Sequence, residues 1–99
     1  MEKNNFVALV AEVKHEHYTD TAVLLLTEEM ACKVTEKVVE TVLKVMYDGY
    51  CTGVSVQYVQ VGSDAYNNFM LRMLSNVENN HSDVACLLDM LVTTVNKIL

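Results

Sequence analysis

The chain has 99 residues, of which 52% are hydrophobic and 20% charged. This composition excludes a disordered protein and favours a single globular domain over residues 1–99. Thirteen acidic residues against seven basic ones give a formal net charge of −6, which disfavours direct binding to nucleic acid or to anionic membranes.

The three cysteines are widely spaced, and no Cys-x-x-Cys pair occurs among Cys32, Cys51 and Cys86. Reduced thiols in a cytoplasmic protein are the simplest explanation of this odd number. The first residues lack the basic and apolar regions of a secretory signal, so none is expected. The most apolar runs, such as residues 22–26, are too short to span a bilayer.

Residues 6–17 predict a first strand. Its alternation gives one face that begins apolar and ends in two histidines: Val7, Leu9, Ala11, Val13, His15 and His17. Residues 18–20 predict a turn in which the Asp20 side chain bonds to nearby backbone. Residues 21–26 are apolar on both faces, so they fit a central strand that pairs with the first one as a hairpin.

A helix is predicted to begin after Thr27, whose side chain caps it, and to end at residues 47–49. Glu28 and Glu29 then meet the positive end of the helix dipole, and Gly49 takes the left-handed conformation that ends the helix. Apolar residues recur along it at helical spacing: Ala31, Val34, Val38, Val42, Val45 and Met46.

Residues 54–61 predict a third strand, which Gly62 ends. Ser63 is expected to cap a second helix with Asp64 at its first position, and Ser82 to cap a third helix that runs to the C-terminus. The second helix has a regular apolar stripe: Tyr66, Phe69, Met70, Met73, Leu74 and Val77. The third has a wider one: Val84, Leu87, Leu88, Leu91, Val92, Val95, Ile98 and Leu99.

The order ββαβαα predicts an α+β fold, in which a small three-stranded sheet is covered by three helices, mainly on one face. Three strands leave two edges and one face incompletely protected. Together with the wide stripe of the last helix, this indicates self-association, since a second copy is the simplest partner. The homodimer interface is expected on that helix: Leu88, Leu91, Val92, Val95 and Leu99.

His15 and His17 are the first candidates for chemistry. Alternate residues of a strand point the same way, so a His-x-His pair can bind one metal ion through two imidazoles. A catalytic zinc or iron needs a third protein ligand, and none has a recognisable spacing. The competing interpretation is that both rings finish the apolar face where it meets solvent. A pH switch based on the imidazoles is a further alternative.

Cys86 is the second candidate, because a helix start and the nearby His81 would favour its thiolate. Asp83 disfavours the thiolate, and a small apolar side chain in a core is the competing interpretation. The acidic residues form no catalytic set, since helix starts and a solvated helix face account for them.

The leading hypothesis is therefore a non-catalytic protein-binding domain without a cofactor. Its most specific version is a small acidic inhibitor or regulator of the type that phages encode, acting on a host protein such as a nucleic-acid-binding enzyme complex. Carboxylates for a basic groove and tyrosine anchors are the expected contacts: Glu28, Glu29, Glu36, Glu40, Tyr47 and Tyr50. Two alternatives remain: a metal-binding protein or small metalloenzyme using His15 and His17, and an accessory subunit whose sheet edge pairs with a larger complex.

Overall fold

The computed structural model describes residues 6–78 and 83–98, and it confirms the predicted α+β fold. The predicted strands and helical regions follow one another in the expected order, except that the first helical region is divided in two. The elements are β1 (Phe6–Lys14), β2 (Thr19–Thr27), α1 (Glu28–Lys33), α2 (Glu36–Met46), β3 (Gly53–Gln60), α3 (Asp64–Glu78) and α4 (Asp83–Ile98).

The three strands form an antiparallel sheet in the order β2-β1-β3. The hairpin of β1 and β2 is confirmed, with Phe6 opposite Thr27 and Lys14 opposite Thr19. The prediction that residues 21–26 form the central strand is wrong, because β1 lies between the other two. β2 is apolar on both faces for a different reason: α4 packs on one of its faces and α3 on the other.

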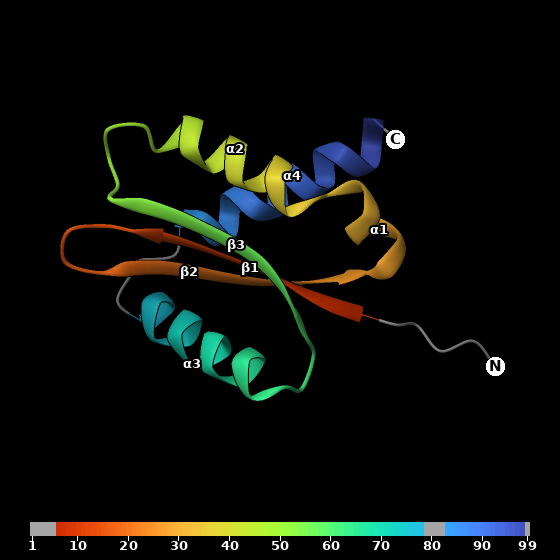
Figure 1. Cartoon of the computed structure of the whole chain (residues 1–99), viewed down its shortest axis with the longest axis horizontal. Coiled ribbons are helices and arrows are strands. Elements are labelled where there is room, and N and C mark those ends of the chain that lie inside the picture. The colour runs from red at the N-terminus through yellow and green to blue at the C-terminus, as the bar shows by residue number, and fades with distance from the viewer. Residues whose placement is uncertain (1–5, 79–82, 99) are drawn as a thin grey trace.

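Within the described ranges, α1, α2 and α4 cover one face of the sheet and α3 covers the other (Figure 1). On the first face α2 packs mainly on β3 and α4 mainly on β2, while α1 reaches the end of the hairpin. On the second face α3 packs mainly on β2. The expectation of helices mainly on one face is thus confirmed, but α3 also protects the face that was expected to stay open.

The buried core lies between the sheet and the layer of α1, α2 and α4. Its side chains come from β1, β2, the α1–α2 junction, α2 and α4: Leu9, Ala11, Val13, Ala22, Leu26, Val34, Val39, Leu43, Val84 and Leu88. Burying such a set is the main stabilising contribution in a chain of this size.

The helix predicted from Thr27 divides at Val34 and Thr35. Thr27 caps α1 as predicted, since its Oγ1 accepts a hydrogen bond from the Met30 N–H at 3.2 Å. Thr35 caps α2 in the same way through the Val38 N–H, at 3.3 Å. A second capping residue within the apolar stripe therefore starts a new helix, and Val34 becomes a buried joint.

α3 begins as predicted, because the Ser63 Oγ accepts a hydrogen bond from the Tyr66 N–H at 3.2 Å. Its predicted stripe is only partly correct. Leu74 and Val77 are more than half exposed, and the buried residue near the end of α3 is Asn76. The proposed cap of α4, Ser82, lies outside the described residues.

Gly49 and Gly62 both adopt the left-handed conformation, with φ of 78° and 85°. Gly62 follows the end of β3 as predicted. The predicted glycine cap of α2 is wrong, because the helix ends at Met46 with Tyr47 as its C-cap and Gly49 lies in the turn that follows. No helix within the described ranges combines the length and apolar character that crossing a membrane requires.

Candidate functional site

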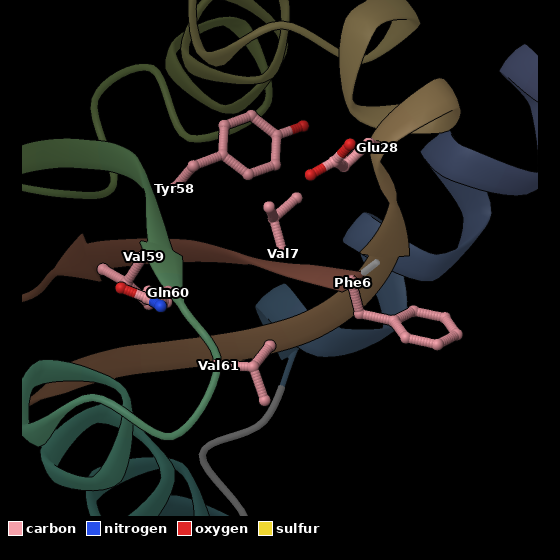
Figure 2. Close-up of a pocket in the computed structure, with 7 residues that line it drawn as sticks. All are labelled: Phe6, Val7, Glu28, Tyr58, Val59, Gln60 and Val61. Carbon is pink, nitrogen blue, oxygen red and sulfur yellow. The ribbon is translucent and has the colours of Figure 1, made fainter. Parts of the chain in front are cut away.

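A broad open pocket of about 620 Å³ lies where β1 begins and β3 ends. Figure 2 shows Val7, Tyr58 and Glu28 pointing toward one another, while Phe6 turns away from them. The complete lining is Phe6, Val7, Glu28, Tyr58, Val59, Gln60 and Val61. A mainly apolar hollow bordered by one carboxylate suits an aliphatic stem that ends in a positive charge.

Tyr58 connects this pocket to the junction between α1 and α2. Its hydroxyl donates a hydrogen bond to the carbonyl oxygen of Val34. Burial raises the pKa of Tyr58 to about 12, and the negative charge of Glu36 adds to the shift. Tyr58 is therefore neutral at physiological pH, and the start of α2 brings a second carboxylate near the pocket.

The predicted partner-binding carboxylates lie on α1 and α2. Glu28, Glu29 and Glu36 are exposed, so a partner can reach them. Glu40 is half-buried and forms an ion pair with Lys44, one turn along α2, at 2.7 Å. Three of the four carboxylates thus remain without an ion-pair partner among the described residues.

The two predicted tyrosine anchors differ in accessibility. Tyr50 is 79% exposed in the turn after α2. Tyr47 is half-buried and packs against the core. Burial raises the pKa of Tyr47 to about 12, and the nearby charges of Asp20 and Asp83 contribute further. Tyr50 is therefore the more accessible of the two.

His15 and His17 lie in the loop between β1 and β2, so the prediction that they share a strand face is wrong. The His15 ring stacks on Tyr18 with centroids 4.6 Å apart and meets Tyr47 edge-on at 5.8 Å. Its Nδ1 donates a hydrogen bond to the carbonyl oxygen of Tyr50 at 3.1 Å. His17 is exposed. The two imidazoles therefore have different surroundings, and His15 is already held by contacts within the chain.

Within residues 6–78 and 83–98, no three histidine, cysteine, aspartate or glutamate side chains form a group that could hold a metal ion. His81 lies outside those ranges. Cys86 and Cys32 are exposed and Cys51 is half-buried, all three as free thiols. The metal site at His15 and His17 and the nucleophilic role of Cys86 therefore stay predictions. Among the described residues, no third metal ligand joins the two histidines.

The predicted turn at residues 18–20 is also wrong, because Asp20 lies inside β2 and is only 1% exposed. Its Oδ2 accepts a hydrogen bond from the Val84 N–H at 3.1 Å, at the start of α4. Burial raises the pKa of Asp20, although the bond from Val84 opposes that shift; Asp83 raises the pKa further and His15 lowers it. Asp20 is thus a capping residue supplied from the sheet.

Glu12 is a buried carboxylate on the α3 face of the sheet. Its Oε2 accepts hydrogen bonds from the Thr21 hydroxyl at 2.8 Å and from Arg72 Nη1 at 2.5 Å. The Arg72 guanidinium also lies over the ring of Phe69, 5.6 Å from its centroid. A carboxylate inside the apolar sequence of β1 was the available signal for this contact.

An apolar groove of about 180 Å³ separates α2 from α4. Met46 and Met90 border it, and both are more than half exposed. The complete lining is Val42, Leu43, Met46, Leu87, Leu88, Met90, Leu91 and Thr94. An exposed apolar surface of this kind is typical of a contact with another protein.

The residues predicted for a homodimer interface differ in how much of their side chains is exposed. Leu88 is 1% exposed, so it packs inside the protomer and offers almost no surface to a second copy. Leu91, Val92 and Val95 are half-buried against the core, and Leu99 lies outside the described residues. Met90, at 64% exposure, presents more apolar surface than any of these four described residues.

Searches of protein-family models, of curated proteins and of solved structures find no match to this chain.

Proposed function

We propose that this chain is a non-catalytic protein-binding domain, which uses the carboxylates of α1 and the start of α2 to contact a basic surface of its partner. The observation that carries the proposal is the placement of exposed Glu28 and Glu29 on α1, with Glu28 at the open pocket and the charge of Glu36 acting on Tyr58. Negative charge around an apolar hollow favours encounter with basic groups and then offers an apolar contact.

The more specific form is a small acidic inhibitor or regulator of the phage type, which covers a basic groove on a host nucleic-acid-binding enzyme complex. The net charge of −6 supports this form, since long-range attraction to a basic groove speeds association. Because the exposed carboxylates Glu28, Glu29 and Glu36 lie on α1 and at the start of α2, these two helices would face the basic groove.

Charge reversal tests the proposal with a matched control. Glu28→Lys, Glu29→Lys and Glu36→Lys are combined in one variant, and Glu16→Lys, Asp64→Lys and Asp89→Lys in the other, which has the same net charge. All six positions are exposed. Cross-linking in the native cell followed by quantitative mass spectrometry should lose the partner with the first variant only. Equal capture by both variants would contradict the proposal.

A second copy of the chain is the proposed occupant of the groove between α2 and α4. A two-fold symmetric interface needs a projection and a hollow on the same patch. The exposed Met90 and Met46 supply projections beside the groove, and methionine adapts well to such a contact. The cytoplasmic location proposed for the chain fits its free thiols.

Sedimentation and light scattering at micromolar concentration test this self-association. Met90→Lys should shift the chain toward the monomer, whereas Leu71→Lys, at an exposed apolar position on α3, should not. A wild-type chain that stays monomeric, or two variants with the same oligomeric state as the wild type, would contradict the proposal.

A further inference from the structure

The two edges of the sheet differ in how their backbone groups are satisfied. Residues along an antiparallel strand direct their N–H and C=O groups alternately to one side and to the other. The Lys14 carbonyl oxygen accepts a hydrogen bond from the Thr52 N–H at 2.7 Å, so the backbone groups of Lys14 point toward β3. Lys14 pairs with Thr19 on β2 and with Gly53 on β3. The alternation can therefore be followed along both edge strands.

On β2, this alternation directs the backbone groups of Thr19 and Val23 away from the sheet, and α3 covers them. The Asn76 Nδ2 donates a hydrogen bond to the Thr19 carbonyl oxygen at 2.7 Å. The Met73 sulfur accepts the Val23 N–H at 3.3 Å. Two side chains of α3 thus occupy positions where a further strand would bind, so the β2 edge is blunted.

On β3, the same alternation directs the backbone groups of Val54, Val56 and Tyr58 outward. No hydrogen bond to these outward groups is found from any residue in the described ranges. In Figure 1, β3 passes in front of β1 and β2, and no helix or strand crosses in front of it. The outer edge of β3 is therefore open along three alternate residues.

β3 also lacks the sequence features that keep an edge strand from pairing. Gly53–Gln60 contains neither proline nor a charged residue. All but the last of its residues are half-buried, so the strand is not fully covered. An uncharged edge with unpaired N–H and C=O groups is a template for another strand.

We infer that the outer edge of β3 binds an extended segment of another protein, which adds as a fourth strand and places a lysine or arginine side chain in the pocket beside Glu28. This inference rests on the proposed protein-binding function and names the kind of partner. The edge ends at the apolar pocket of Val7 and Tyr58, where Glu28 and Glu36 supply negative charge. Backbone pairing supplies affinity, and the basic side chain supplies selectivity.

A second copy of the chain fits this edge poorly. Because α2 packs mainly on β3, a symmetric pairing of two β3 strands would bring two copies of α2 over neighbouring strands. Neighbouring strands lie about 4.8 Å apart, whereas packed helix axes are about 8–10 Å apart. A single extended segment has no helix above it and avoids this clash. Its antiparallel pairing with β3 brings its amino-terminal end to the pocket, since β3 ends there.

The test uses a synthetic peptide of alternating valine and threonine with one lysine near its amino terminus. Hydrogen exchange of the intact chain, followed by NMR, should show slower exchange of the outward amides of Val54, Val56 and Tyr58 when the peptide is added. A peptide with N-methyl groups at alternate residues cannot pair with the edge and should not protect these amides. Equal protection by both peptides, or none by either, would overturn the inference.

Three protein variants probe the edge and the charge separately. Val54→Pro removes an outward N–H near the start of an edge strand, where proline is tolerated, and should abolish peptide binding. If it does not fold, the N-methylated peptide still decides the question. Glu28→Gln should weaken binding of the lysine peptide about twofold to fivefold, while its neighbour Glu29→Gln should change it less. A peptide with glutamate in place of lysine should bind most weakly.

The outcomes separate this inference from the proposed function. If charge reversal on α1 and α2 loses the cellular partner, but Val54→Pro retains it and no peptide protects β3, the protein-binding function stands and the inference fails. Protection of the β3 amides that rises with protein concentration alone, without peptide, would assign the edge to a second copy and also overturn it.

Discussion

The carboxylate of Asp20 in β2 accepts a hydrogen bond from the backbone N–H of Val84, 64 residues later in the chain, at 3.1 Å. Both residues are buried. The contact caps the start of α4 from the sheet, so it fixes where the last helix docks. Because the carboxylate is buried and its Oδ1 has no hydrogen-bond partner among the described residues, its protonation is coupled to folding.

We expect Asp20→Ala to lower the free energy of unfolding by about 1–3 kcal/mol, because the N–H of Val84 then stays buried without an acceptor. Asp20→Asn retains an oxygen at this position and should cost less than half as much. Urea denaturation of both variants checks the difference. An alanine variant as stable as the asparagine variant would show that the cap contributes little.

We expect a pH dependence of stability that Asp20→Asn removes. Burial raises the pKa of Asp20 in the folded state above its ordinary value of 3.8, so the folded state holds this proton more tightly than the unfolded state. The free energy of unfolding should therefore fall as the pH rises from 3.8 through the folded-state pKa, and then level off.

The measurement is the difference between wild type and Asp20→Asn in urea denaturation over a pH series. Taking the difference in free energy of unfolding between the two proteins reduces the contributions of their other carboxylates. The charged groups that act on Asp20 are Asp83 and His15. A difference that does not change with pH in the acid range would contradict the expectation.

The contact between Glu12 and Arg72 holds α3 against the sheet. Arg72→Met should lower the free energy of unfolding by about 1–3 kcal/mol, because among the described residues the buried Glu12 carboxylate then retains only Thr21 as a hydrogen-bond donor. Adding Glu12→Gln should recover part of the loss, since the amide oxygen can still accept from Thr21 and the uncompensated charge is gone. A double-mutant cycle measured by thermal denaturation tests this. Strictly additive losses would mean that the two side chains are not coupled.

Tyr58→Phe removes the hydroxyl that donates to the buried carbonyl oxygen of Val34. The variant should lose about 1–2 kcal/mol of unfolding free energy, and Tyr50→Phe, at an exposed position, should lose almost none. The wild type should also lose stability as the pH rises from 10 to about 12, because only the unfolded Tyr58 ionises in that range. Tyr58→Phe should show a shallower alkaline decline, measured by circular dichroism. Identical alkaline curves would contradict the assignment.

The candidate site was only partly predictable. Exposed Glu28 and Glu29 follow from helix-start chemistry, because carboxylates favour the positive end of the helix dipole. Glu36 was expected on the solvated face of one long helix, and the structure places it instead in the first turn of α2. The pocket beside Glu28 was not predictable, because it joins the start of β1 to the end of β3, which are 51 or more residues apart. His15 and His17 looked like a pair on a strand face, but the strand ends at Lys14 and the alternation has no meaning in the loop.

The sequence by itself determined the number and type of most elements, because apolar periodicity and capping residues act within a few neighbouring residues. It determined the hairpin, the turns at Gly49 and Gly62 that follow α2 and β3, and the start of α3 at Ser63. The tertiary structure alone decided that β1 is the central strand and that α3 covers the second face. It also decided that Asp20 caps α4 and that the β2 edge is blunted while the β3 edge is open. These features depend on which distant side chains meet across the sheet, and local pattern cannot specify that.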